Sequence, residues 1–344
     1  MNPPIKKRLW NALRALRGAP AGPAAHEAPP LREDEAAEAR LFFPREKFFI
    51  FGHARSGTTM LTRLIRLHPE VHCNYQAHFF TRPPLLEALV ADPAVGEWLS
   101  RDSNRWNRGR DLSPVVLRAA ADFILERDAQ RAGKRIVGDK SPNSLLDGRA
   151  VRLLHNVYPD ARFIYIVRDG RDAALSHRFQ SFIDFPEQLS RQDLKIRADF
   201  IRQPEPYLNG AVSLFGKAAL RRAAEGWVRN VNETHQLGGV LYAERYITLR
   251  YEDLLEDPWS EMQRLWNFLG AAANAPDLRA ALEAEMQHNP DAEWQQQKAR
   301  EIAEPLQKGR RGSWREMFTP RDRDLFHSIA GSTLQAWGYP LESG

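Results

Sequence analysis

The fold is decided by residues 47–65, which read KFFIFGHARSGTTMLTRLI. Residues 48–51 form a short apolar run that ends at Gly52, and such a run is typical of a buried parallel strand. A loop that contains Gly57 follows, and residues 60–65 then open a helix. A glycine-containing loop between a strand and a helix is the setting in which backbone N–H groups cradle a phosphate. The stretch therefore predicts a phosphate-binding loop.

The rest of the chain repeats the order strand, loop, helix. Further strands are predicted at residues 135–138, 163–167 and 246–251. After the last of them, Asp257 and Pro258 have the pattern of an N-cap and a first helical proline, and this helix is expected to stop at Gly270. Alternating strands and helices indicate a parallel sheet with helices on both faces. The predicted fold is α/β, a three-layer parallel sheet flanked by helices of the P-loop nucleotide-binding type, with ligands at the carboxyl ends of the strands.

Composition and charge narrow the class of partner. The 344 residues carry a formal net charge of +5, with a pI near 9.4, which favours an anionic partner. No nucleic acid is expected, because finger, helix-turn-helix and aromatic–basic patterns are absent from the sequence. Cys73 is the only cysteine, which excludes an internal disulfide and favours a reducing, cytoplasmic location. The ten histidines are scattered, so no metal is expected.

Residues 1–44 are interpreted as a basic N-terminal segment with a flexible linker, and residues 45–344 as the main domain. Residues 5–17 carry Leu9, Leu13 and Leu16 at helical spacing among basic side chains. A helix in peripheral contact with a membrane is one interpretation, and a solvated basic tail is the other. No apolar run is long enough to span a bilayer, and no signal peptide is visible.

The phosphate loop differs from that of nucleoside-triphosphate enzymes. Gly52 and Gly57 match the spacing GxxxxG, but Thr58 stands where that motif requires the lysine that reaches the β- and γ-phosphates. The positive charge lies inside the loop instead, at Arg55. This arrangement disfavours a nucleotide kinase or ATPase. It suits a nucleotide whose 5′ group is shorter than a triphosphate.

Residues 55–59, RSGTT, resemble the 5′-phosphosulfate loop of the sulfotransferases that use 3′-phosphoadenosine 5′-phosphosulfate (PAPS), and most closely their bacterial and protein-tyrosine branch. With the further motifs described below, the resemblance spans residues 47–318. It implies an enzyme that transfers a sulfuryl group from PAPS to a hydroxyl or amine acceptor and needs no metal. It also assigns the 5′ end of the cofactor to Arg55, Ser56, Gly57, Thr58 and Thr59.

A second motif, residues 168–176, directly follows the clearest predicted strand. It resembles the family's 3′-phosphate site, which implies that Arg168 and Ser176 bind this phosphate. Arginine suits the role because its guanidinium offers two parallel N–H donors. An ion pair of Arg168 with Asp169 or Asp172 is the alternative, and it could coexist with binding.

Two shorter motifs and one tyrosine complete the resemblance. Residues 307–314 resemble a C-terminal glycine–basic loop over the 3′-phosphate, which assigns Lys308 and Gly309 to the cofactor, although Gln307 stands where the usual pattern has arginine. Residues 138–143 resemble the lysine–small–proline turn beside the sulfuryl group, which makes Lys140 catalytic. Tyr251 resembles the tyrosine near the nucleotide base, with a buried structural tyrosine as the alternative. Arg55 and Lys140 are expected to stabilise the charge that develops during transfer.

The general base is the point where the sequence departs from the branch it resembles. That branch usually carries a glutamate two residues before a histidine, just after the first helix. Here Gln76 occupies the glutamate position, and an amide cannot accept a proton. We hypothesise that His78 is the base, because histidine ordinarily titrates near pH 6.5, and that Gln76 positions the acceptor. His53 and Asp139 are weaker candidates, and a packed or capping His78 is the alternative.

Two other functions stay open at this point: a P-loop nucleotide kinase, and a module that binds PAP (the desulfated nucleotide) or another anion without catalysis. The insertions at residues 85–130 and 179–224 are expected to form the acceptor pocket or its lid, or to be surface helices. The sequence identifies neither the acceptor nor the oligomeric state.

Overall fold

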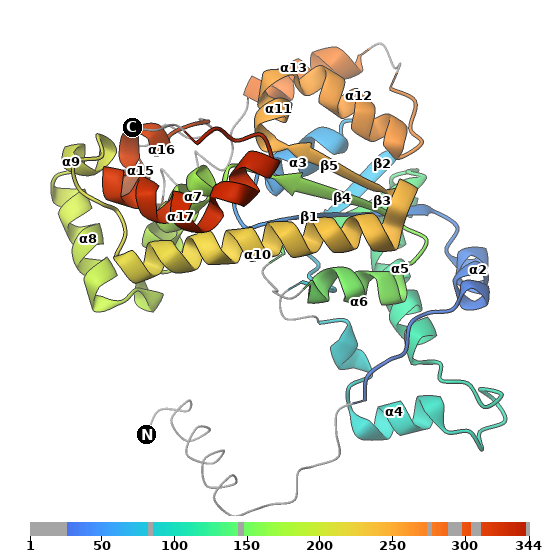
Figure 1. Cartoon of the computed structure of the whole chain (residues 1–344). Helices are drawn as coiled ribbons and strands as arrows, with labels where there is room; N and C mark the ends of the chain where they lie inside the picture. Colours follow the sequence, from blue (N-terminus) through green and yellow to red (C-terminus); the bar gives the residue numbers. More distant parts are fainter. Residues whose placement is uncertain are drawn as a thin grey trace, which may run out of the picture.

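The computed structural model describes residues 26–81, 85–143, 148–273, 277–287, 298–303 and 311–341. Within these ranges, parallel strands form one five-stranded sheet in the order β2-β3-β1-β4-β5 (Figure 1). The strands are β1 (Glu46–Gly52), β2 (Val71–Tyr75), β3 (Ile136–Lys140), β4 (Arg162–Val167) and β5 (Tyr246–Arg250). Since β3 and β4 flank β1 and run in the same direction, the loops after all three strands open at one edge of the sheet.

Helices surround this sheet. In chain order the α-helices are α2 (Glu33–Phe42), α3 (Thr58–Ile65), α4 (Pro93–Ser100), α5 (Ser113–Arg131), α6 (Arg149–Val157), α7 (Gly170–Asp184), α8 (Arg191–Arg202), α9 (Glu205–Leu208), α10 (Lys217–Tyr242), α11 (Tyr251–Glu256), α12 (Pro258–Phe268), α13 (Leu278–Gln287), α15 (Arg300–Ala303), α16 (Trp314–Met317) and α17 (Pro320–Ala336). Short 3₁₀ helices are η1 (Glu87–Leu89), η2 (Pro186–Gln188) and η3 (Ala243–Arg245).

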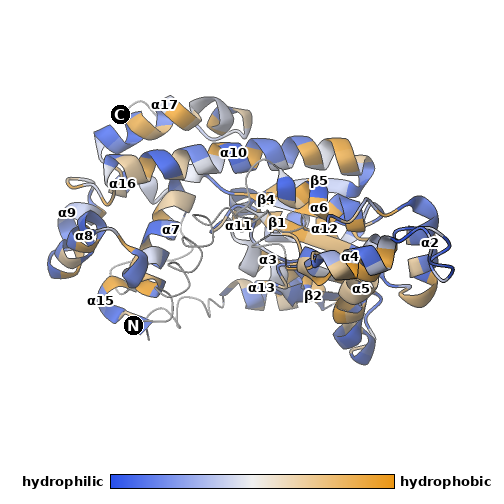
Figure 2. Ribbon diagram, turned by 90° about the horizontal axis from the view of Figure 1, so that it is seen from below, coloured by the Kyte–Doolittle hydropathy of each residue, from blue (hydrophilic) through white to orange (hydrophobic). Residues whose placement is uncertain are grey.

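Successive side chains of a strand point to opposite faces of the sheet. Helices cover both of these faces, so each face has its own buried core. Phe48 and Ile50 of β1 belong to a core that includes residues of α3, α12 and α13. Phe49 and Phe51 belong to a second core with residues of α5, α6, α7 and α10. The long helix α10 lies along this second face with α17 packed beside it (Figure 1). Figure 2 shows apolar residues along the strands and mixed polar and apolar residues around the outer helices. The predicted three-layer parallel α/β fold is confirmed.

Most predicted elements agree with the structure, and two details differ. The predicted strands correspond to β1, β3, β4 and β5, and the Asp257 side chain accepts a hydrogen bond from the Ser260 N–H at 3.0 Å, as an N-cap should. The helix after it ends before Gly270, whose φ is +75°. Tyr251, however, begins α11 and does not belong to the strand. Strand β2 has no counterpart among the predicted strands, because it is short and buries only Val71 and Cys73 at the sheet edge.

The N-terminal boundary differs from the predicted one. Helix α2 lies inside the segment 1–44 assigned to the tail and linker, and it packs against α5. Leu31, Ala36 and Ala39 are buried there, so the folded part of the chain begins before residue 45. The proposed basic helix at residues 5–17 lies outside the described residues.

The two insertions are mostly helical, with turns and irregular chain at residues 101–112 of the first and 209–216 of the second. Phe182 and Tyr207 of the second insertion are buried in the core, so they pack helices together and are not exposed to an acceptor. Trp98 and Trp106 of the first insertion are exposed, and their ring centroids lie 5.1 Å apart. Across the described ranges, no helix combines the length and the apolar character that a membrane crossing requires.

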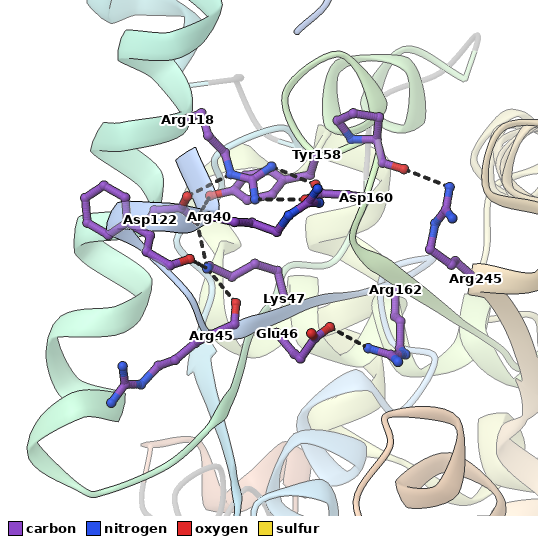
Figure 3. A network of polar contacts seen from close by, with 12 residues as sticks. Arg40, Arg45, Glu46, Lys47, Arg118, Asp122, Tyr158, Asp160, Arg162 and Arg245 are labelled. Carbon is purple, nitrogen blue, oxygen red and sulfur yellow. Dashed lines mark hydrogen bonds and ion pairs between the residues drawn. The ribbon is translucent and has the colours of Figure 1, made fainter. Parts of the chain in front are cut away.

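A buried charge network joins α2, α5 and β1 to the turn before β4, at the end of the sheet where the strands begin (Figure 3). Arg118 lies 2.7 Å from Asp122 and 2.7 Å from Asp160. Lys47 lies 3.4 Å from Asp122, which also accepts a hydrogen bond of 2.9 Å from the Tyr158 hydroxyl. Because these charges are buried, each needs its partners to offset the loss of hydration.

We therefore expect Asp122→Ala to lower the free energy of unfolding by about 3–5 kcal/mol, because the buried cations Lys47 and Arg118 both lose this carboxylate as a partner. Chemical denaturation measures the change. The matched control is Glu97→Ala, which removes an exposed partner of Arg101 and should cost about 0–1 kcal/mol. Equal losses in the two variants would contradict a structural role for the network.

Candidate active site

The phosphate loop lies between the end of β1 and the start of α3. Gly57, the N-cap of α3, has a φ of +85°, which glycine adopts without strain. The first N–H groups of a helix have no acceptor within the helix, so those of Thr58 and Thr59 are directed toward a ligand at the loop. Ser56 is fully buried, and its Oγ has no hydrogen-bond partner among the described residues. This loop has the donors that an anion requires.

The loops after β1 and β4 contact each other directly. The Arg55 Nε donates a hydrogen bond of 3.1 Å to the Ser176 Oγ on α7. The Arg168 Nη1 donates one of 3.1 Å to the Arg55 carbonyl. The Trp227 indole N–H of α10 in turn donates to the Arg168 carbonyl at 3.1 Å, which holds that end of β4 in place. The residues assigned to the two ends of the nucleotide thus meet at the carboxyl edge of the sheet.

Tyr251 closes the same cluster from α11. A Cβ added to Gly57 would lie 2.2 Å from the Tyr251 Cδ2, so the ring packs directly on the glycine. The Arg168 guanidinium lies 4.7 Å from the centroid of that ring, within the range of a cation–π contact. Burial raises the pKa of the Tyr251 phenol, which keeps it neutral.

Lys140 approaches the loop from the other neighbouring strand. It is fully buried at the end of β3, and its Nζ donates a hydrogen bond of 3.3 Å to the Thr59 Oγ1. The same Nζ lies 5.3 Å from the centroid of the Tyr75 ring. Because β3 and β4 lie on opposite sides of β1, Lys140 and Arg168 flank the phosphate loop from opposite sides.

The carboxylates near Arg168 have other partners. Asp169 forms an ion pair of 2.7 Å with Arg171. Asp172 accepts hydrogen bonds from the N–H groups of Gly312 at 2.6 Å and Trp314 at 3.1 Å. Burial raises the pKa of the Asp172 carboxyl, and the positive charge of Arg168 acts against that rise.

The C-terminal glycine–basic loop is only partly visible. Lys308 and Gly309 lie outside the described residues, so their positions are not assigned. The two N–H groups that bond to Asp172 belong to the described end of this loop, and they connect it to α7. From the sequence, Asp172 is expected only as an alternative partner of Arg168, and the acidic side chains at 169 and 172 are the only signal for it.

The candidate bases His53 and His78 lie in the loops after β1 and β2, and Asp139 lies within β3. Burial lowers the pKa of His53 to about 4, so this histidine is a poor proton acceptor near neutral pH. His78 is half-buried; its N–H donates to the Ser141 Oγ at 3.1 Å, and its Nδ1 lies 2.8 Å from the Thr81 Oγ1. Since Ser141 is adjacent to Lys140, His78 lies on the same edge of the sheet as the phosphate loop. Among the described residues, no three His, Cys, Asp or Glu side chains gather in a way that could hold a metal ion.

The chain also matches a known family. Residues 47–275 match the family model described as the sulfotransferase family. The chain belongs to this family. The match begins at β1 and extends past α12, so it includes the phosphate loop, Lys140, the residues 168–176 and Tyr251.

Individual relatives of this sulfotransferase-family chain are distant. It is 25% identical over 230 residues to the protein-tyrosine sulfotransferase of Drosophila melanogaster, covering 66% of this chain and 38% of that protein. It is 24% identical over 250 residues to protein-tyrosine sulfotransferase A of Caenorhabditis elegans, covering 71% and 54%. The nodulation protein NoeE of Sinorhizobium fredii is 30% identical over 141 residues, covering 37% and 30%. The chain thus spans about half or less of the length of these relatives.

Solved structures of related proteins show low overall similarity. The sulfotransferase of Alicyclobacillus acidocaldarius is 23% identical with a TM-score of 0.41, over 79% of this chain and 99% of that one. The mouse sulfotransferase SULT7A1, solved with PAP, is 18% identical with a TM-score of 0.46, over 89% and 90%.

The contact between Gly57 and Tyr251 gives a test of the site's construction. We expect Gly57→Ala to lower the free energy of unfolding by about 1–3 kcal/mol. The backbone at position 57 has a positive φ, which strains alanine, and the new Cβ collides with the Tyr251 ring. Thermal and chemical denaturation measure it. The control is Gly226→Ala within α10, where a Cβ meets no atom within 4 Å and should be neutral or stabilise by up to about 1 kcal/mol. Similar behaviour of the two variants would argue against this packing.

Proposed function

We propose that this chain transfers a sulfuryl group from PAPS to a hydroxyl or amine acceptor. The observation that carries the proposal is the convergence of Arg55, Arg168 and Lys140 on one phosphate loop that has Thr58 where a triphosphate enzyme needs lysine. Membership of the sulfotransferase family supports it.

The proposed nucleotide has anionic groups at both ends. The residues assigned to the 5′ group are Arg55, Ser56, Gly57, Thr58 and Thr59. The buried Ser56 Oγ and the glycine packed beneath Tyr251 fit an anion held close to the backbone. Arg168 and Ser176 are proposed to bind the 3′-phosphate, with Lys308 and Gly309 beside them. Tyr251 is proposed to lie near the base.

The proposed reaction forms one bond to sulfur and breaks another. The acceptor oxygen or nitrogen attacks the sulfur, the bond between sulfur and the bridging oxygen of the nucleotide breaks, and PAP leaves. Negative charge grows on the bridging oxygen and on the oxygens of the sulfuryl group. Arg55, Lys140 and the backbone N–H groups of the loop are proposed to stabilise that charge.

The acceptor must lose a proton as it attacks, and we propose that His78 takes it. His78 is half-buried beside the end of β3 that carries Lys140, and an imidazole is a side chain that can accept a proton. The pKa of His53, near 4, makes that residue the poorer base. Gln76 is proposed to orient the acceptor by hydrogen bonds. A cytoplasmic location and a peripheral membrane contact through residues 5–17 belong to the same proposal.

A second function is favoured by one observation. Gln76 replaces the glutamate that the resembled branch usually carries, so the chain could bind PAP without turnover. Binding and turnover must therefore be measured separately. The two experiments that follow do so.

The first experiment concerns binding. PAP at a hundred times its dissociation constant should stabilise the protein by about 2.7 kcal/mol, and AMP at equal concentration clearly less, because AMP lacks the 3′-phosphate. Arg168→Ala should bring the affinity for PAP down toward that for AMP. Arg131→Ala removes an exposed arginine at the end of α5 and serves as the charge-matched control. Thermal shift and calorimetry measure both; equal affinities of wild type for PAP and AMP would remove Arg168 and Ser176 from the site.

The second experiment concerns turnover, using sulfur-labelled PAPS with a simple phenol, a tyrosine peptide, an alkyl alcohol, an amine and a glycan. At saturating PAPS, Lys140→Ala should lower the rate by about 10²–10³-fold, as expected for a group that stabilises the transition state. His78→Ala should cause a comparable loss, and Gln76→Glu should not abolish transfer. The control is Lys134→Ala, since Lys134 precedes the opposite end of β3 and bonds to the Pro69 carbonyl. PAP binding with neither transfer nor PAPS hydrolysis in the wild type would identify a non-catalytic module.

A further inference from the structure

Hydrogen bonds tie the segment 76–78, just after β2, to the end of β3. The Gln76 N–H donates to the Lys140 carbonyl at 2.7 Å. The Ala77 N–H donates to the Asp139 Oδ1 at 3.0 Å. The His78 N–H donates to the Ser141 Oγ at 3.1 Å. Three successive N–H groups are therefore held by residues 139–141, which are the last two residues of β3 and the residue that follows it.

This segment has an uncommon backbone conformation. Gln76 has a φ of +55° and His78 a φ of +51°. Both lie in the left-handed region of backbone conformation, which residues other than glycine rarely adopt. Such residues persist only when surrounding contacts hold them, and they are common at functional sites. The contacts that hold this segment include the Lys140 carbonyl at Gln76, Asp139 at Ala77 and Ser141 at His78.

Asp139 is the centre of this arrangement. Its Oδ1 accepts from Ala77, and its Oδ2 accepts a hydrogen bond of 2.6 Å from the Ser141 hydroxyl, which itself accepts from His78. The side chain is 2% exposed, and burial raises the pKa of the carboxyl to about 6. The neighbouring strand β2 contributes the buried, neutral thiol of Cys73. Burying a carboxylate costs free energy of hydration, and hydrogen bonds such as these two offset part of that cost.

We propose that Asp139 is a positioning residue that holds Gln76 and His78 in the geometry required for catalysis, directly through Ala77 and indirectly through Ser141. The proposal rests on the proposed function only where it concerns turnover. It makes Lys140 and His78 parts of one rigid unit, because Asp139, Lys140 and Ser141 are consecutive residues. A shift of about 1 Å in such a group can cost about 10²-fold in rate.

A positioning role and a general-base role for Asp139 are separated by substitution. Both Asp139 oxygens accept hydrogen bonds from groups of the protein itself, one from a backbone N–H and one from a hydroxyl. A carboxylate oxygen has a further lone pair, so these bonds alone do not prevent proton transfer to it. Asparagine keeps an oxygen for the Ala77 N–H but cannot act as a base, so Asp139→Asn distinguishes the two roles.

The experiment compares Asp139→Asn, Asp139→Ala and Ser141→Ala with the wild type. Hydrogen exchange of the peptide that covers residues 76–80 reads the geometry without turnover. Exchange should rise in Asp139→Ala and Ser141→Ala and stay near the wild-type rate in Asp139→Asn. The affinity for PAP, measured by calorimetry, should stay within about twofold in all three, because the phosphate loop is untouched.

Turnover is then measured with labelled PAPS and the best acceptor of the panel above, or with water where none reacts. Asp139→Ala should lower kcat by about 10²-fold without a change in the KM for PAPS, and Asp139→Asn should restore most of it. If Asp139→Ala does not fold, Asp139→Asn and Ser141→Ala test the same bonds. An Asp139→Asn variant with wild-type exchange and no turnover would make Asp139 the base and overturn the proposal. Unchanged exchange in Asp139→Ala and Ser141→Ala would overturn it also, whereas a wild type without turnover refutes only the proposed function.

Discussion

The parallel pairing of β1 with β3 on one side and β4 on the other is the constraint on which the rest of the structure depends. It places the ends of three strands side by side, so that Arg55, Lys140 and Arg168 meet although more than a hundred residues separate the first from the last. Parallel strands have this effect because their carboxyl ends lie at one edge. The helices α5, α7 and α10 cover one face and α3, α12 and α13 the other, which makes the pairing stable.

The two ends of the sheet use charge differently. At the end where the strands begin, Lys47 and Arg118 are buried against carboxylates, and the network joins helices to strands. At the carboxyl end, two carboxylates bond to backbone N–H groups: Asp172 accepts from Gly312 and Trp314 of the C-terminal loop, and Glu252 accepts from the Asp169 N–H. Acidic side chains there connect the backbone of neighbouring loops around the phosphate loop.

The site was predictable from sequence where a motif is local. The loop 52–59 has its glycine, arginine and threonines within a few residues, and a strand before it and a helix after it suffice to indicate an anion site. The 168–176 segment is equally local. Asp139 and Ser141 were not predictable as partners of residues 76–78, because those contacts depend on the pairing of β2 with β3. Strand β2 is too short and too polar to be predicted from its sequence. Tyr251 was placed on the wrong element, yet its contact with Gly57 was compatible with the expected role.

The sequence by itself determined the alternation of strands and helices, the phosphate loop with its missing lysine, and the family that the motifs resemble, because each of these is written in neighbouring residues. Only the tertiary structure decided which of the ionisable groups are buried and what they contact. It showed that burial lowers the pKa of His53 to about 4, that each oxygen of Asp139 accepts a hydrogen bond from the protein, and that the chain before residue 45 contributes to the core. The physical reason is that hydration and hydrogen-bond partners are set by residues far away in the chain, brought close only when the sheet forms.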